Sequence, residues 1–196
     1  MSEIPGSGRS TPDAGSSAAA GPSAPIELRP PALADAQAMW SLVRASTLDD
    51  NSPYAYLMLA RYHAGTCAVA ERDGALVGFV SAFVPPEQPD TLFVWQVGVS
   101  EQARGTGLAT RLIASLLERE GTAPLRYLEA TVTPSNLASL TLFRRLAERL
   151  GTRCRESRCF PSHLFPGGGD RQHHEEELLL RIGPFTTPRP AATNRA

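Results

Sequence analysis

The chain has 196 residues, enough for one domain with a hydrophobic core and too few for two of ordinary size. Hydrophobic residues make up 42% and charged residues 20%, as in ordinary globular proteins. A formal net charge of -1 gives no overall attraction to nucleic acid or to an anionic membrane, so we expect neither as a partner.

The two ends of the chain lack residues that could build a core. Residues 1–25 and 186–196 are rich in small residues and proline, which predicts disordered tails around one folded domain at 26–185. The N-terminal segment has no secretory-signal pattern, and the longest apolar run is too short to span a bilayer. The 3 cysteines, an odd number, do not indicate a disulfide framework, so we expect a cytoplasmic protein.

Periodicity divides the domain into strands and helices. In chain order we expect a strand at 26–30, helices at 32–47 and 52–63, strands at 66–72, 75–84 and 91–99, a helix that begins after residue 107, a strand at 125–133, a helix at 136–151 and a strand at 177–183. Ser52 fits an N-cap, with Pro53 at the first helical position. The Asp73–Gly74 pair between two apolar runs predicts a hairpin.

The sequence QARGTG, residues 102–107, joins an apolar strand to an amphipathic helix. Successive backbone N–H groups at such a helix start can bind phosphate oxygens, and the helix dipole adds to this attraction. Gly105 and Gly107 let the backbone approach a ligand closely, and Arg104 adds positive charge. On this motif alone, a turn that serves only chain geometry stays an alternative.

Two common nucleotide-binding patterns do not fit this turn. The Rossmann pattern places three glycines near the first strand of a βαβ unit, whereas here the third glycine is absent and a hairpin comes before the turn. The Walker pattern requires a lysine, and all 19 basic residues of this chain are arginines.

The spacing Q-x-x-G-x-G after an apolar strand resembles the acyl-CoA pyrophosphate loop of the GNAT N-acetyltransferase superfamily. The order of the surrounding elements is similar as well. This resemblance implies a GNAT fold of the α/β (α+β) class, with a mixed central sheet of about six to seven strands flanked by helices and with the fourth and fifth strands splayed apart. It also implies acetyl-CoA as the co-substrate and no metal.

The same resemblance assigns the residues that hold the cofactor. Backbone groups of the strand at 91–99 would bind the pantetheine arm, with the N–H near Val97 facing the thioester oxygen. Asn136, two residues after Pro134, matches an asparagine that also holds this arm. The expected cofactor-binding residues are Val97, Val99, Arg104, Gly105, Thr106, Gly107, Leu108 and Asn136. Phe143 stands where many relatives carry a tyrosine general acid, so another group must protonate the thiolate.

Four stretches closely resemble the L-2,4-diaminobutyrate acetyltransferases: residues 47–57, 90–99, 127–147 and 167–185. The similarity implies acetyl transfer to the 4-amino group of L-2,4-diaminobutyrate, which gives N4-acetyl-L-2,4-diaminobutyrate for ectoine biosynthesis. It also implies a homodimer.

A diamino acid carries two ammonium groups and one carboxylate, so its pocket needs carboxylates, an aromatic face and a hydrogen-bond donor. Asp49 can anchor an ammonium, and Trp95 can cover one as a cation–π partner. Glu129 stands in an otherwise apolar strand, where a carboxylate needs a reason, and we expect it to accept the amine proton. The other expected site residues are Asn51, Thr131 and His174 for substrate binding and Tyr54 as proton donor to the thiolate.

Several alternatives stay open at this point. The acidic run before Pro53 also fits an ordinary helix N-terminus, and Trp95 also fits a core position. A zinc site is not favoured, because its candidate ligands lack a C-x2-C pair; they are Cys154, Cys159, His163, His173 and His174. For function, the alternatives are a GNAT enzyme for another small amine, such as a polyamine, and a non-catalytic acyl-CoA-binding module.

Overall fold

The computed structural model describes residues 24–46, 48–119, 125–165 and 174–186. The expected disordered tails lie almost entirely outside this range and stay a prediction. None of the described helices is both long and apolar enough to cross a membrane.

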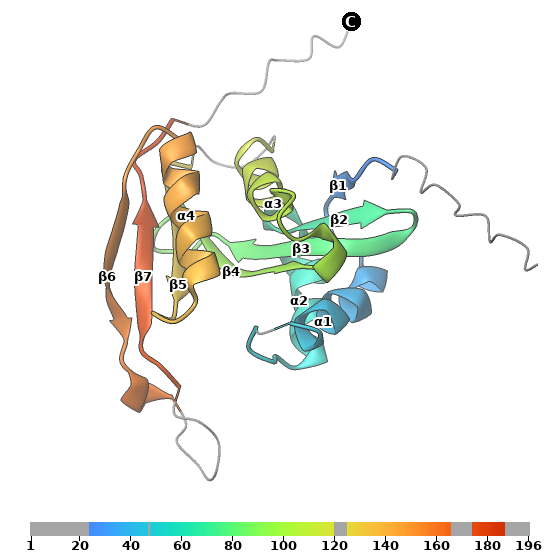
Figure 1. Cartoon of the computed structure of the whole chain (residues 1–196), viewed down its shortest axis with the longest axis horizontal. Coiled ribbons are helices and arrows are strands. Elements are labelled where there is room, and N and C mark those ends of the chain that lie inside the picture. The colour runs from blue at the N-terminus through green and yellow to red at the C-terminus, as the bar shows by residue number, and fades with distance from the viewer. Residues whose placement is uncertain (1–23, 47, 120–124, 166–173, 187–196) are drawn as a thin grey trace, which may run out of the picture.

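Seven strands of the described chain form one mixed sheet in the order β1-β2-β3-β4-β5-β7-β6 (Figure 1). They are β1 (Glu27–Arg29), β2 (Ala68–Arg72), β3 (Ala75–Phe83), β4 (Thr91–Val99), β5 (Tyr127–Val132), β6 (Cys154–Phe160) and β7 (Glu177–Ile182). The α-helices are α1 (Ala36–Arg44), α2 (Pro53–Tyr62), α3 (Leu108–Leu117) and α4 (Leu137–Arg149). The expected mixed sheet flanked by helices is confirmed.

Helices cover both faces of the sheet, as their amphipathic spacing requires. α3 and α4 pack on one face, and their buried residues join those of β2 to β5 and β7 in the larger core, which includes Leu112, Leu116, Leu128, Phe143 and Leu146. α1 and α2 pack on the other face in a smaller core, which includes Met39, Val43, Tyr56, Leu59 and Phe79.

The parallel pair β4–β5 opens along its length. The two strands pair only from Thr91 opposite Tyr127 to Val94 opposite Ala130. Beyond this point β4 continues to Val99 against β3, and β5 continues against β7. The expected splay is therefore confirmed, and it leaves backbone groups at the facing edges of both strands open to a ligand.

Local signals located most element boundaries. Asp73 and Gly74 both have positive φ, 53° and 75°, as a two-residue hairpin requires. Ser52 caps α2 by accepting a hydrogen bond from the Tyr54 N–H at 3.3 Å. The first expected helix is shorter than 32–47, since it begins with the 3-10 turn Leu33–Asp35 and α1 ends at Arg44.

One strand was not expected from the sequence. Among the described strands, β6 lies at the edge of the sheet and pairs with β7 alone. Most of its side chains are exposed, and only the two ends of the strand offer half-buried cysteines. It therefore lacks the apolar alternation by which a strand is recognised.

Candidate active site

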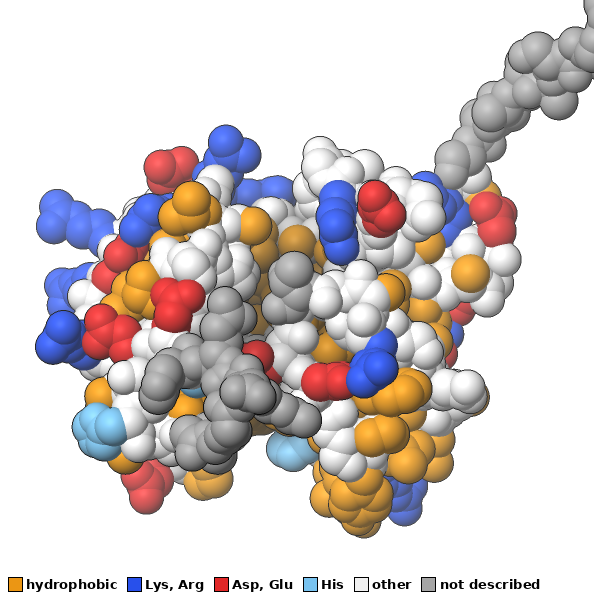
Figure 2. Space-filling model, turned by 60° about the horizontal axis from the view of Figure 1, so that its bottom comes forward, with side chains coloured by type: hydrophobic (Ala, Val, Ile, Leu, Met, Phe, Trp, Pro, Cys, Tyr) orange, Lys and Arg blue, Asp and Glu red, His pale blue; other side chains and the backbone are white. Residues whose placement is uncertain are grey.

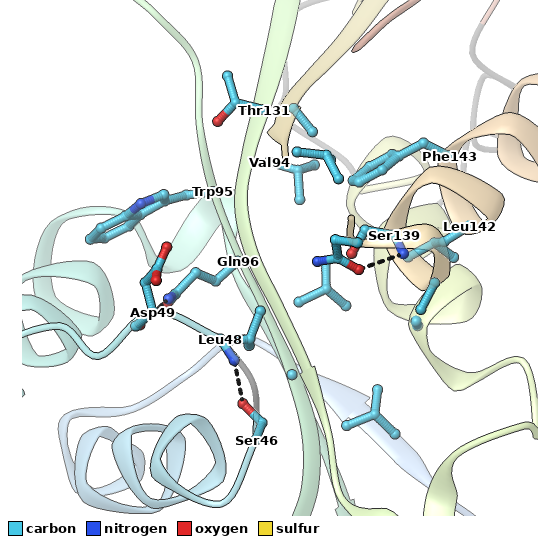
Figure 3. A pocket seen from close by; sticks show the side chains of 18 of the residues that line it. Ser46, Leu48, Asp49, Val94, Trp95, Gln96, Thr131, Ser139, Leu142 and Phe143 are labelled. Atoms are coloured by element: carbon cyan, nitrogen blue, oxygen red, sulfur yellow. Dashed lines mark hydrogen bonds between the residues drawn. The ribbon is translucent and has the colours of Figure 1, made fainter. Parts of the chain in front are cut away.

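A cavity of about 2130 Å³ opens where β4 and β5 diverge. Its walls come from the segment between α1 and α2, from β4 and β5, from the turn before α3, from α4 and from the start of β7. Figure 3 shows Asp49, Trp95 and Gln96 on one side of this space, and Ser139, Leu142 and Phe143 of α4 on the other.

The turn before α3 leaves room for a ligand directly at its backbone. Gly105 and Gly107 have φ of 74° and 78°, a conformation that other residues adopt at a cost. A Cβ atom added at either glycine would meet no atom within 4 Å, so the space in front of both is open. The Thr106 hydroxyl donates to the Ala103 carbonyl at 2.7 Å and so closes the turn.

The N-terminus of α3 offers hydrogen-bond donors to this space. Gly107 is its N-cap and supplies no side-chain acceptor, and the first helical bond is from Arg111 N–H to the Gly107 carbonyl at 3.1 Å. Among the described residues, the N–H groups of Leu108, Ala109 and Thr110 have no hydrogen-bond partner, and all three residues line the cavity. With Arg104 beside them, these groups fit the pyrophosphate of a coenzyme A ester.

The opposite wall begins at Asn136. Its side-chain oxygen caps α4 by accepting from the Ser139 N–H at 3.0 Å, the dashed line beside Ser139 in Figure 3. Its amide NH2 has no partner in the described part of the chain. Phe143 lines the same wall but is only 4% exposed and belongs to the larger core, so it contributes packing and no proton.

Three ionisable side chains from distant segments meet at the cavity. His174 Nε2 lies 3.4 Å from Asp49 Oδ2 and 4.0 Å from Glu177 Oε1. His174 Nδ1 lies 2.7 Å from the Glu175 carbonyl oxygen, so this nitrogen carries the proton and donates it. The Phe165 ring stacks on the imidazole at 3.8 Å. Two carboxylates thus stand beside one oriented imidazole.

This environment raises the pKa values of two side chains, Glu177 and His174. Burial raises the pKa of Glu177, and the charges of Asp49 and Glu175 add to the rise, against a hydrogen bond from Thr131 and the charge of His174. The hydrogen bond to the Glu175 carbonyl raises the pKa of His174, with Asp49 adding to it. A carboxylate whose pKa is raised by burial is a stronger proton acceptor than an exposed one.

The acetyltransferase (GNAT) family model matches residues 36–148 of the chain. A relative from Halalkalibacterium halodurans, L-2,4-diaminobutyric acid acetyltransferase, is 51% identical over 160 residues, which cover 82% of each chain. The protein of that name from Marinococcus halophilus is 53% identical over 156 residues, 80% of this chain and 88% of the relative. The chain belongs to the GNAT acetyltransferases, in their diaminobutyric acid acetyltransferase branch.

Solved structures agree with this assignment. The diaminobutyrate acetyltransferase EctA from Paenibacillus lautus, in complex with L-2,4-diaminobutyric acid and coenzyme A, has a TM-score of 0.78 and 38% identity, and the match covers 84% of this chain and 98% of that one. Ard1 from Thermoplasma volcanium has a TM-score of 0.61 at 15% identity and supports the GNAT fold alone.

In this acetyltransferase Glu129 does not stand free in the cavity. It is 6% exposed and forms an ion pair with Arg181, which faces it from β7. Arg181 also donates to Gln88 Oε1 at 3.1 Å and lies 4.0 Å over the Tyr127 ring. Glu129 is not among the residues that line the cavity, whereas Thr131, two positions further on the same face, is. The guanidinium neutralises the carboxylate to which the sequence assigned the base role.

Glu177 is the site residue that the sequence analysis missed. It begins β7, its side chain is 13% exposed, and it lines the cavity. Its only local signal is a glutamate at the start of an apolar strand, and the run of three glutamates at 175–177 hides which of them points inward.

Most other expected substrate residues come together at the GNAT cavity. Asp49, Asn51, Trp95 and His174 line it, and Trp95 is 40% exposed, so the core alternative for this ring is wrong. Tyr54 does not line it. This tyrosine lies in the first turn of α2 and is 65% exposed, and the structure therefore does not place it as a proton donor to the thiolate.

A buried polar chain holds Asp49 in place. Tyr56 donates its hydroxyl proton to Gln96 Oε1 at 3.0 Å, and Gln96 Nε2 donates to the Asp49 carbonyl at 3.0 Å. Gln96 is 6% exposed, and its backbone N–H donates to the Ser81 hydroxyl at 3.2 Å. A buried polar group destabilises the fold when it has no hydrogen-bond partner. These hydrogen bonds therefore tie the segment between α1 and α2 to β4.

The ligand atoms of Asp49, His174 and Glu177 lie within 4.8 Å of one another, a spacing compatible with a metal ion. The residues of the zinc alternative do not form this cluster apart from His174, and His173 lies outside the described residues. An ammonium group suits the carboxylates of Asp49 and Glu177.

Proposed function

We propose that this acetyltransferase transfers the acetyl group of acetyl-CoA to the 4-amino group of L-2,4-diaminobutyrate, forming N4-acetyl-L-2,4-diaminobutyrate for ectoine biosynthesis. The observation that carries this proposal is one cavity that joins the anion-binding turn to the cluster of Asp49, His174 and Glu177. Carboxylates suit the ammonium groups of a diamine, and the imidazole suits its carboxylate. The diaminobutyric acid acetyltransferases that are similar over most of the chain support the same substrate.

Bound acetyl-CoA would supply the activated thioester. The α3 N–H groups and Arg104 hold its pyrophosphate, Val97, Val99 and Asn136 hold the pantetheine arm between the diverging strands, and an N–H of β4 near Val97 binds the thioester oxygen. These residues place the acetyl carbon within the cavity, beside the amine subsite.

The amine must lose a proton before it can attack. An alkyl ammonium of pKa near 10.4 is only about 0.1% neutral at pH 7.5, which corresponds to roughly 4 kcal/mol of barrier. Glu177 accepts this proton, because it lines the cavity and its pKa is raised by burial. Glu129, the acceptor expected from the sequence, is held by Arg181 and does not line the cavity.

The α-amine of the substrate loses a proton more readily than the 4-amine, so selectivity for the 4-amine comes from positioning. Asp49 and Trp95 bind the α-ammonium, His174 binds the carboxylate in its protonated form, and Asn51 and Thr131 complete the polar wall. This arrangement leaves the 4-amine as the group directed toward Glu177 and the thioester.

The test is coenzyme A release from acetyl-CoA with L-2,4-diaminobutyrate, ornithine, lysine and a polyamine, with NMR identification of each product. We expect preferred turnover of diaminobutyrate to the 4-acetyl isomer alone. Preference for a polyamine would refute the substrate assignment, because a polyamine has no carboxylate to bind. Absence of turnover with all four amines, while acetyl-CoA still binds, would refute catalysis and favour the acyl-CoA-binding module.

We also propose that the enzyme is a homodimer whose interface includes exposed side chains of α2 that do not line the cavity. Tyr54, Leu57 and Tyr62 are exposed, at 65%, 42% and 68%. Figure 2 shows hydrophobic side chains gathered in its lower right part, the side on which α1 and α2 lie. The double variant L57E/Y62E should elute as a monomer in size-exclusion chromatography with light scattering, and an unchanged dimer would place the interface elsewhere. The cytoplasmic location expected from the sequence stays a prediction.

A further inference from the structure

Two arginines that line the cavity have no partner for their charge among the described residues. Arg104 lies in the turn before α3 and Arg145 lies on α4; both line the cavity, and neither has a hydrogen-bond or ion-pair partner in the described part of the chain. Arg144, the residue before Arg145, is by contrast paired, since its Nε lies 2.8 Å from Glu156 Oε1. An unpaired guanidinium on the wall of a binding cavity suits an anionic ligand.

The position of Arg145 on α4 is defined by helical spacing. The residues of α4 that line the cavity include Ala138, Thr141, Leu142 and Arg145, at the i, i+3, i+4 and i+7 positions of one face. Asn136, at the start of this wall, is the residue to which we assign the pantetheine arm. Arg145 comes nine positions after Asn136, about 13.5 Å along the helix axis. Arg145 therefore lies on the α4 wall of the cavity, well beyond its Asn136 end.

The charges of coenzyme A exceed what the α3 turn can meet. The coenzyme carries a pyrophosphate and, beyond it, a separate phosphate monoester on the 3′-oxygen of its adenosine. The free N–H groups of Leu108, Ala109 and Thr110, together with Arg104, suit the pyrophosphate, which leaves the monoester for a second cation of the cavity.

We propose that Arg145 binds the 3′-phosphate of coenzyme A, so that α4 recognises both the pantetheine arm and the phosphoadenosine end of the cofactor. This inference rests on the proposed use of acetyl-CoA and is independent of the amine substrate. Guanidinium binds a phosphate monoester with two parallel N–H donors, which glutamine at the same position cannot reproduce.

The test is isothermal titration of the wild-type protein with coenzyme A and with 3′-dephospho-coenzyme A, which keeps the pyrophosphate and lacks the monoester. The same titrations are made with R145Q and with the control R149Q, an exposed arginine of the same helix that does not line the cavity. Thermal unfolding of all three proteins confirms that each variant is folded.

We expect the wild type and R149Q to bind coenzyme A about five- to tenfold more tightly than the dephospho form, as for one solvent-accessible charged pair. R145Q should bind both forms equally, with the affinity that the wild type has for the dephospho form. A fivefold or greater preference retained in R145Q would overturn the assignment. Equal weakening of both forms would also overturn it, by placing Arg145 at the pyrophosphate.

These titrations contain no amine, so they separate the two proposals. If the protein prefers coenzyme A over the dephospho form as expected but acetylates no diamine, the role of Arg145 stands and the substrate assignment is refuted. If the wild-type protein binds neither form of coenzyme A, both proposals are refuted.

Discussion

Replacing Glu177 by glutamine tests the proton acceptor most directly. The substitution keeps the shape of the side chain and removes its ability to accept a proton. Because Glu177 lines the cavity beside His174 and Asp49, we expect kcat to fall about 10²- to 10⁴-fold, the usual contribution of a general base, which corresponds to roughly 3 to 5 kcal/mol of barrier. The assay is coenzyme A release at saturating diaminobutyrate and acetyl-CoA.

The pH dependence supplies a second readout. Burial raises the pKa of Glu177 above its ordinary value of 4.5, so the rate in the wild type should rise with pH through an acidic limb that lies above that value. The limb should be absent in E177Q. The same burial destabilises the folded protein when Glu177 is ionised. The stability that the raised pKa contributes is therefore present at low pH and is lost as the pH rises through the pKa of Glu177. E177Q should therefore be at least as stable as the wild type near neutral pH.

Two matched variants distinguish a base from a merely nearby charge. E176Q removes a neighbouring carboxylate that pairs with Arg158 at 3.3 Å outside the cavity, and should retain wild-type kcat. E129Q removes the partner of Arg181 and should lower stability more than kcat. If E177Q keeps kcat within about threefold while stably folded E129Q loses it about 100-fold, Glu129 is the base and this reasoning is refuted.

Three further substitutions test the rest of the site. Gly107→Ala should raise the KM for acetyl-CoA and destabilise the fold by about 1 kcal/mol, because φ of 78° disfavours a side chain; an unchanged KM would remove this turn from the cofactor site. Tyr56→Phe should cost about 1 kcal/mol in denaturant unfolding and raise the KM for diaminobutyrate more than that for acetyl-CoA, since Gln96 holds the Asp49 segment; equal changes in both KM values would contradict a positioning role. Asp49→Asn should lower the pKa of His174, measured by NMR titration, because Asp49 contributes to its rise; an unshifted titration would separate the two side chains.

The features that the sequence determined are those made by residues close together in the chain. The hairpin at Asp73–Gly74 and the cap at Ser52 depend on a few neighbouring residues. The turn at residues 102–107 is equally local, and its two glycines at positive φ are the ones the motif indicated. The overall fold followed from a family resemblance that rests on these same local motifs and on their order.

Tertiary structure decided which side chains reach the cavity. Strand periodicity put Glu129 and Thr131 on one face of β5, but only the pairing of β5 with β7 brings Arg181 to Glu129, across 52 residues of chain. The same pairing brings Glu177 to the cavity beside Asp49, although the two residues are far apart in the sequence. Helical spacing likewise did not decide which residues of α2 reach the cavity: Met58 lines it, whereas Tyr54, one turn earlier, does not. Sequence patterns specify the face on which a side chain lies, but the partner it meets there depends on which distant segment the sheet places beside it.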